Sequence, residues 1–180
     1  MEIVFVRHGT PDYTLADQRR MTQLEKDYAP LTRECIPFIR SQSEAAVFAG
    51  ADLMISSPYT RALQTAEILN RSLGLELFVE HDLREWRADL AGGHIELSER
   101  DRRWHEYRAG LKHGRRIPDA SYESAFDLKD RVLKVLQRYQ HCTKVIVVAH
   151  LNVLESVCGY QEAGIGCGEY RIFSLHEVCS

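Results

Sequence analysis

The sequence predicts an α/β fold, a three-layer αβα sandwich in which helices cover both faces of a mostly parallel sheet. Three apolar runs, at residues 3–6, 52–56 and 144–149, have the composition of strands buried on both faces. Two of them lead directly into stretches with helical spacing, and strands that alternate with helices favour a parallel sheet. A chain of 180 residues can bury a core of ordinary size, so residues 1–180 are predicted to form one domain.

The first strand ends in Arg7, His8 and Gly9. A buried strand is rigid, and a glycine lets the backbone approach a ligand closely, so this position suits functional side chains held with little freedom. The tripeptide alone is explained as well by a strand that ends in polar surface residues. Its interpretation therefore depends on other stretches that converge on the same place.

Residues 11–27 are polar and begin with turn-forming residues, and a short helix is predicted around residues 16–26. This segment is expected to cross the mouth of a pocket at the end of the first strand. Pro37 suits the first turn of a helix better than its interior, so the next helix is predicted over residues 37–48.

The run at residues 52–56 is followed by a Ser57-Pro58 turn and a helix predicted over residues 59–73, with Arg61 in its first turn. Helix N-termini attract anions through free backbone N–H groups and the helix dipole. An arginine adds a bidentate fork that suits phosphate. The start of this helix is therefore a candidate anion site.

A short strand is predicted at residues 76–79, and the loop after it carries acidic side chains. One carboxylate among 26 acidic residues is most often a solvated surface group. If the strand ends form one pocket, Glu85 becomes the best candidate for a general acid, with Glu80 and Asp82 as the alternatives. The pocket otherwise holds no group suited to protonating a leaving alkoxide.

Residues 84–116 differ from the rest of the chain in composition. They contain nine Lys or Arg against six Asp or Glu, with aromatic residues and histidines interleaved, although the whole chain carries a net charge of −3. Two interpretations stay open. The segment is either a solvated helix of mixed charge around residues 97–111 with a loop, or a lid that recognises an anionic or aromatic substrate.

Residues 119–140 have the spacing of an amphipathic helix. The apolar run at residues 144–149 then delivers His150 at its carboxyl end, and helical spacing resumes at Val153. Near-alternation at residues 170–175 predicts an edge strand.

Several of these elements place polar residues at the carboxyl ends of apolar strands. In open α/β sheets a ligand lies outside the carboxyl ends of the parallel strands, so His8 and His150 are expected to meet there. Arg7 and Arg61 join them. A pocket with two arginines and two histidines suits a phosphate group.

Composition excludes several other classes of function. A net charge of −3 and a pI near 6.2 give no electrostatic case for nucleic acid or an anionic membrane as partner. No signal peptide and no membrane span can be recognised. The five cysteines contain no C-x-x-C pair, so free thiols in the cytoplasm are expected and a zinc site is not.

The sequence resembles the histidine phosphatase superfamily, which is also called the phosphoglycerate mutase-like family. Four ordered blocks carry the resemblance, and weaker matches stand at residues 27–32, Glu123-Ser124 and Arg131. The blocks are Arg7-His8-Gly9, Ser56-Ser57-Pro58-Tyr59-Thr60-Arg61-Ala62-Leu63-Gln64-Thr65-Ala66, Leu83-Arg84-Glu85-Trp86, and His150 after the last long apolar strand.

The resemblance implies a phosphatase that hydrolyses small phosphomonoesters of metabolites through a phosphohistidine, without metal or cofactor. It favours His8 as the nucleophile and Glu85 as the acid, and it implies that Arg7, Arg61 and His150 bind the phosphate. The two guanidinium groups would lower the pKa of a nearby imidazole and keep it neutral. A neutral imidazole is what nucleophilic attack requires.

Two other functions stay open because the sequence departs from the family pattern. A phosphoglycerate-type mutase would pass the phosphoryl group to a second substrate, but Pro11 and Thr14 stand where mutases tend to have other residues. A regulatory module that binds phosphate without turnover is the second alternative, because Leu151-Asn152 stands where glycines are usual. Asn152 either touches a ligand or caps the last long helix, and capping is the commoner use.

Overall fold

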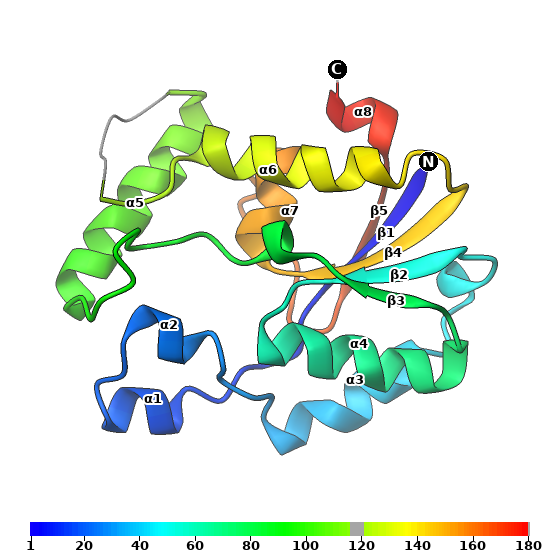
Figure 1. Cartoon of the computed structure of the whole chain (residues 1–180), viewed down its shortest axis with the longest axis horizontal. Helices are drawn as coiled ribbons and strands as arrows, with labels where there is room; N and C mark the ends of the chain where they lie inside the picture. The colour runs from blue at the N-terminus through cyan, green and yellow to red at the C-terminus, as the bar shows by residue number, and fades with distance from the viewer. Residues whose placement is uncertain (116–120, 180) are drawn as a thin grey trace.

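The computed structural model describes residues 1–115 and 121–179 and confirms the α/β class. In the described residues the strands form a five-stranded sheet in the order β3-β2-β4-β1-β5 (Figure 1). All neighbouring strands are parallel except β5, which pairs antiparallel with β1 at the edge, as its sequence pattern predicts. The strands are β1 (Glu2–Arg7), β2 (Leu53–Ser56), β3 (Leu77–Val79), β4 (Lys144–Ala149) and β5 (Tyr170–Ser174).

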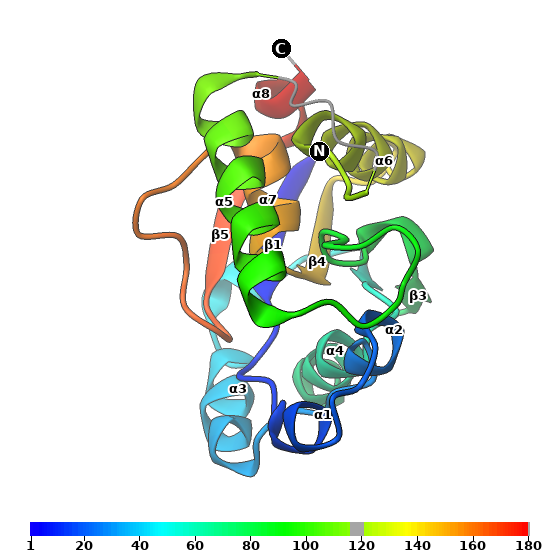
Figure 2. The same cartoon turned by 90° about the vertical axis from the view of Figure 1, so that its left-hand side faces the viewer.

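Helices cover both faces of this sheet (Figures 1 and 2). The helices α3 and α4 pack on one face, and α6 and α7 pack on the other together with part of α5. The longer helices are α3 (Ile36–Gln42), α4 (Thr60–Leu73), α5 (Leu97–His113), α6 (Ala125–Arg138) and α7 (Leu151–Cys158). The shorter ones are α1 (Thr14–Gln18), α2 (Gln23–Lys26) and α8 (Leu175–Cys179), with 3₁₀ turns at Arg33–Cys35, Ala46–Phe48 and His81–Leu83.

The unbroken apolar runs of the central strands reflect burial on both faces. In β1, Val4 and Val6 point into the core beneath α3 and α4, whereas Ile3 and Phe5 point into the core beneath α6 and α7. Successive side chains of a strand alternate between faces, so a strand covered on both sides needs apolar residues at every position. This requirement explains why β1 was recognisable from sequence.

The carboxyl ends of β1, β4 and β2 lie side by side because the three strands are parallel and in register. Arg7 is opposite Ala149, and the His8 amide donates to the Ala149 carbonyl at 2.9 Å. On the other side of β4, the Ser57 amide donates to the Val148 carbonyl at 2.9 Å. This edge therefore gathers the ends of three strands from distant parts of the sequence.

The prediction of a single helix around residues 16–26 was wrong. The structure has two short helices, α1 and α2, which are separated at Thr22. The Thr22 hydroxyl accepts from the Glu25 amide, and the Thr22 amide donates to the Glu25 carboxylate at 2.8 Å. This capping box starts a new helix and interrupts the old one.

Other helix boundaries also differ from those predicted. The helix predicted over residues 37–48 begins one residue earlier and ends at Gln42, where the Ser43 hydroxyl donates to the Arg40 carbonyl at 2.7 Å. Such a side-chain bond competes with continuation of the helix. Of the helix predicted over residues 119–140, residues 119 and 120 lie outside the described residues. Its start is at Ala125, because the Ser124 hydroxyl caps it.

Candidate active site

The first residue of the site is His8, immediately after β1, where only 5% of its surface is exposed. Its Nδ1 lies 2.6 Å from the Gly9 carbonyl oxygen, so Nδ1 carries the proton and donates. The Arg61 Nε–H donates to His8 Nε2 at 3.3 Å, which requires a lone pair on that nitrogen. The ring is therefore neutral, with its basic nitrogen directed at an arginine.

Burial is the main reason for this neutral state. It lowers the pKa of His8 to about 3, and the Arg61 and Arg7 guanidinium groups act in the same direction, against the Gly9 carbonyl. From the sequence, the two arginines were expected to lower the pKa of the histidine. The structure adds the larger effect, because a charged imidazole loses its hydration at this depth.

The second histidine, His150, follows β4 and is fully buried. Its ring centre lies 5.0 Å from that of His8, and its Nε2 is 2.7 Å from the Ser57 hydroxyl oxygen. Its Nδ1 is buried and has no partner among the residues that the structure describes. Burial, then Arg61 and His8, lower the pKa of His150 well below its ordinary value.

Arg61 reaches the histidines from the first turn of α4. Its guanidinium group lies over the Tyr59 ring at 4.9 Å and at 5.9 Å from the Tyr13 ring centre. Stacking on aromatic faces holds a guanidinium group in place without consuming its N–H donors. Its charge is thus fixed beside His8 Nε2.

Arg7 is at the same edge of the sheet. Its Nη1 donates to the Ile165 carbonyl at 2.6 Å, and its Nε is buried without a partner in the described part of the chain. Together with Arg61 it adds positive charge around both histidines. The structure therefore brings together all four residues that the sequence placed in a phosphate pocket.

Glu85 faces the same site from the loop after β3. Its Oε1 accepts from the Trp86 amide at 2.7 Å, and its side chain lines a pocket together with Arg61. Burial raises the pKa of Glu85, whereas the Trp86 amide, Arg61, Asn152 and Arg131 lower it. Burial is the largest of these effects, so the pKa of this carboxyl group lies above its ordinary value.

The two alternative acids make contacts elsewhere. Glu80 accepts from the Tyr139 hydroxyl at 2.6 Å and pairs with Arg138 at 3.1 Å. Asp82 pairs with Arg84 at 2.6 Å. Neither lines the pocket that holds Glu85, so geometry favours Glu85 over both.

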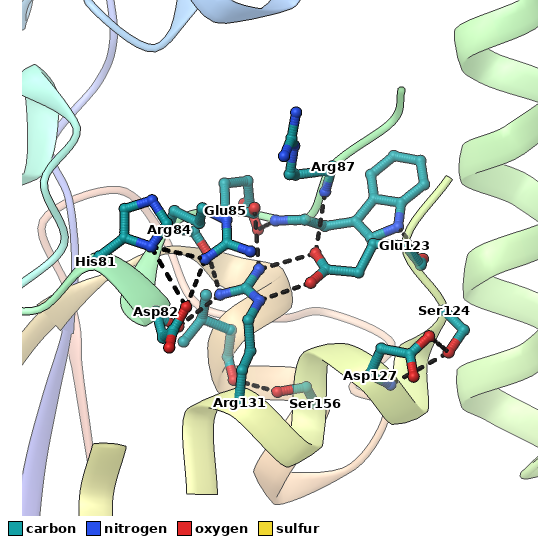
Figure 3. A network of polar contacts seen from close by, with 12 residues as sticks. His81, Asp82, Arg84, Glu85, Arg87, Glu123, Ser124, Asp127, Arg131 and Ser156 are labelled. Carbon is teal, nitrogen blue, oxygen red and sulfur yellow. Dashed lines mark hydrogen bonds and ion pairs between the residues drawn. The ribbon is translucent and has the colours of Figure 1, made fainter. Parts of the chain in front are cut away.

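A buried ion pair holds the loop that carries Glu85 (Figure 3). Arg131 of α6 binds both carboxylate oxygens of Glu123, at 2.6 and 2.8 Å. The same guanidinium group donates to the carbonyls of Asp82, Arg84 and Glu85, at 2.5, 2.8 and 3.2 Å. One side chain therefore fixes three backbone positions of this loop. The weaker sequence matches at Glu123 and Arg131 have a structural role.

The pocket in front of Arg61 and Glu85 has a volume of about 200 Å³. Residues 11–27 and residues 84–116 both contribute to it. In two views α1 and α2 face the N-terminal end of α5 (Figures 1 and 2). Residues 11–27 thus lie at the pocket, as expected; the action of residues 84–116 as a lid stays a prediction. The wall includes Tyr13, Asp17, Gln23, Lys26 and Asp27 from the first segment and Glu85, Trp86, Ala88 and Arg100 from the second.

Sequence reasoning missed the pair formed by Asp27 and Tyr59 in the pocket wall. Both side chains line the pocket, and the Tyr59 ring packs edge-on against His150 with ring centres 5.1 Å apart. Burial raises the pKa of Asp27 to about 6, and burial with the nearby Asp27 charge raises the pKa of Tyr59. Both residues stood in recognised blocks, but their contact joins distant parts of the chain.

Two expectations for individual residues were wrong. The missing side chain of Gly9 does not make room for a ligand, because a Cβ there would lie 2.4 Å from Cδ1 of Ile39 in α3. Asn152 does not cap α7, which begins two residues earlier than expected with His150 as its N-cap. The Asn152 side chain instead acts on Glu85, whose pKa it lowers.

The described part of the chain offers neither a metal site nor a membrane-spanning helix. Residues 1–115 and 121–179 contain no group of three or more His, Cys, Asp or Glu side chains arranged to hold a metal ion. Among the same residues, no helix has both the length and the apolar character that a membrane crossing requires.

Comparison with known proteins gives consistent matches. The family model of the histidine phosphatase superfamily (branch 1) matches residues 3–180. A Bacillus subtilis protein named uncharacterized phosphatase PhoE is 30% identical over 155 residues, which cover 82% of this chain and 70% of the relative.

Solved structures resemble the fold at 20% sequence identity. A mycobacterial glucosyl-3-phosphoglycerate phosphatase superposes with a TM-score of 0.70, covering 95% of this chain and 88% of its own. The Thermus thermophilus protein TTHB049 superposes with a TM-score of 0.66, covering 96% and 92%.

The buried pair of Arg131 and Glu123 should contribute strongly to stability. Replacing Arg131 by Met leaves the Glu123 carboxylate buried without its partner, which should cost about 3–5 kcal/mol of unfolding free energy. The control is Arg71→Met, because Arg71 and Glu67 form an exposed ion pair that should contribute less than about 1 kcal/mol. Urea unfolding measures both losses of unfolding free energy, provided that the dependence of the free energy on urea concentration is the same in all variants. Equal losses in the two variants would contradict the role of the buried pair.

Proposed function

We propose, since the chain belongs to the histidine phosphatase superfamily, that it hydrolyses small phosphomonoesters through a phosphohistidine on His8 without a metal ion. The observation that carries the proposal is the neutral state of His8, whose unprotonated Nε2 accepts a hydrogen bond from Arg61. The name of the Bacillus subtilis relative supports hydrolysis over transfer to a second substrate.

In the first step the phosphoryl group binds where positive charge is concentrated. Arg61 now donates to His8 Nε2, and charged phosphate oxygens accept more strongly than a neutral imidazole does. When a phosphate oxygen of the substrate accepts the hydrogen bond from Arg61 instead, the lone pair of Nε2 becomes free to attack phosphorus. Arg7 and His150 add charge and a hydrogen bond to the remaining oxygens.

The attack forms a bond from His8 Nε2 to phosphorus and breaks the bond from phosphorus to the leaving oxygen. Glu85 gives its proton to that oxygen, so the alcohol leaves neutral and Glu85 becomes a carboxylate. The Gly9 carbonyl, which accepts from Nδ1, stabilises the positive charge that develops on the ring. Burial, which favours the protonated form of Glu85, suits it to this step.

Water completes the reaction in a second step. Glu85, now a carboxylate, takes a proton from water, whose oxygen attacks phosphorus and displaces His8 Nε2. Inorganic phosphate leaves, and both His8 and Glu85 return to their starting states. Two guanidinium groups supply the positive charge that a divalent cation supplies in other phosphoryl transfer reactions.

Covalent labelling of His8 tests the proposed function. A ³²P-labelled phosphomonoester, mixed with the protein in buffer containing EDTA and quenched rapidly without acid, should leave an acid-labile, base-stable phosphate on the peptide containing His8. His8→Ala should abolish the label, and the control His81→Ala, at an exposed side chain, should retain it. Label on His150, or turnover that requires added metal, would contradict the mechanism.

The role of Glu85 predicts a dependence on the leaving group. General acid catalysis typically contributes about 10²- to 10⁴-fold, so Glu85→Gln should slow an alkyl phosphate by roughly that factor. An activated aryl phosphate, which departs readily as an anion, should slow much less. Single-turnover phosphorylation of His8 measures both. Equal losses would show that Glu85 binds substrate or supports the structure, and the assignment of the acid would be wrong.

A further inference from the structure

Ser57 makes a contact with His150 that the proposed mechanism does not use. It comes directly after β2 and is fully buried, as is His150 at the end of β4. Its hydroxyl oxygen lies 2.7 Å from His150 Nε2, and the Tyr59 amide donates to the same oxygen at 3.3 Å. The hydroxyl has no further hydrogen-bond contact in the described part of the chain. Ser57 therefore joins the start of α4 to the second histidine of the site.

The ring of His150 can carry its proton on either nitrogen, and the two forms use this contact differently. Burial and then Arg61 lower the pKa of His150 well below its ordinary value, so the ring is neutral near neutral pH. With the proton on Nδ1, Nε2 accepts a hydrogen bond from the Ser57 hydroxyl. With the proton on Nε2, that nitrogen donates to the Ser57 oxygen instead.

The hydrogen-bond partners of Ser57 favour the proton on Nδ1. In that form the Ser57 hydroxyl accepts from the Tyr59 amide and donates to His150 Nε2, so both its polar functions have partners. In the other form the hydroxyl proton has no acceptor among the described residues, although Ser57 is fully buried. A buried donor without an acceptor destabilises a protein. The surroundings of Ser57 therefore select one tautomer of His150.

This tautomer leaves a buried N–H group on His150 without an acceptor. Nδ1 of His150 has no hydrogen-bond partner among the described residues, and Nε of Arg7, at the same edge of the sheet, also has none. Buried donors of this kind are rare in folded proteins, and a bound ligand that supplies the acceptor is one explanation. Arg7 and Arg61 place positive charge around His150, so the acceptor is expected to be an oxygen of an anion.

We propose that Ser57 is a positioning residue, whose hydroxyl holds the proton of His150 on Nδ1 and makes that N–H group available to a phosphate oxygen. The identity of the anion rests on the proposed function, whereas the tautomer is a property of the protein alone. The other tautomer would have a lone pair on Nδ1, which repels a phosphate oxygen. Ser57 thus determines whether His150 assists or opposes the binding of phosphate.

The ring nitrogens of His150 test the proposal without any substrate. Long-range ¹H–¹⁵N NMR of the intact protein distinguishes a protonated from an unprotonated ring nitrogen, and the signals are assigned by their loss in His150→Gln. Near neutral pH, Nδ1 should be protonated and Nε2 unprotonated. A proton on Nε2 in the unsubstituted protein would overturn the inference, and this measurement does not depend on the folding of a serine variant.

Ser57→Ala removes the hydroxyl that donates to Nε2. The His150 ring should then populate the form with its proton on Nε2. The affinity for inorganic phosphate, measured by calorimetric titration, should fall by roughly 10-fold, because a hydrogen bond to a charged group is lost. An unchanged tautomer in Ser57→Ala would overturn the inference. In the unsubstituted protein, a His150 Nδ1 signal that does not respond to inorganic phosphate would also overturn it.

The matched control is Ser156→Ala. Ser156 lies in α7, the helix that has His150 as its N-cap, and its buried hydroxyl donates to the Val153 carbonyl at 2.8 Å. This variant also loses a buried serine hydroxyl, but it keeps the contact between Ser57 and His150. The tautomer and the phosphate affinity should stay as in the unsubstituted protein. The same change of tautomer in both variants would overturn the specific role of Ser57.

Turnover separates this inference from the proposed function. A protonated Nδ1 that responds to inorganic phosphate, in a protein that hydrolyses no phosphomonoester, supports the inference and refutes the proposed function. Phosphorylation of His8 during turnover, in a protein whose His150 carries its proton on Nε2, supports the proposed function and refutes the inference.

Discussion

The site depends on the burial of a neutral His8 beside a permanent positive charge. The Gly9 carbonyl holds the proton on Nδ1, and Arg61 faces the lone pair on Nε2, so both ring nitrogens have defined roles. Arg61 in turn rests on the Tyr59 ring and is carried by a helix whose start is fixed by the end of β2. A protonated His8 would lose its hydration and face a guanidinium group at hydrogen-bond distance. Charge repulsion and desolvation thus act together to keep a nucleophile available at the edge of the sheet.

The opposite side of the site is organised by hydrogen bonds to backbone. Arg131 binds Glu123 and three carbonyls of the loop that carries Glu85, which gives the acid a rigid base on α6. A planar guanidinium group with five donors suits this task, and a lysine could not replace it. The loop that carries the acid is therefore held by α6, which packs against the sheet.

Much of this arrangement follows from local sequence. Strands buried on both faces need unbroken apolar runs, so β1 and β4 were recognisable, and His8 and His150 at their ends could be placed together by parallel topology. The start of α2 also had a local signal, the Thr22-x-x-Glu25 pattern of a capping box, which sequence reasoning overlooked. Contacts between side chains that are distant in the sequence had no such local signal. The hydrogen bond from Arg61 to His8 depends on how α4 packs beside the end of β1, and burial as the chief cause of the low pKa of His8 depends on the whole core.

The protonation state of the His8 ring tests the account most directly. Long-range ¹H–¹⁵N NMR of the intact protein, with the ring signals assigned by their loss in His8→Gln, follows Nδ1 and Nε2 separately between pH 5 and pH 8. With a pKa of about 3, His8 should keep its proton on Nδ1 and an unprotonated Nε2 throughout this range. A titration centred near the ordinary histidine value of about 6.5, or a proton on Nε2, would contradict the account.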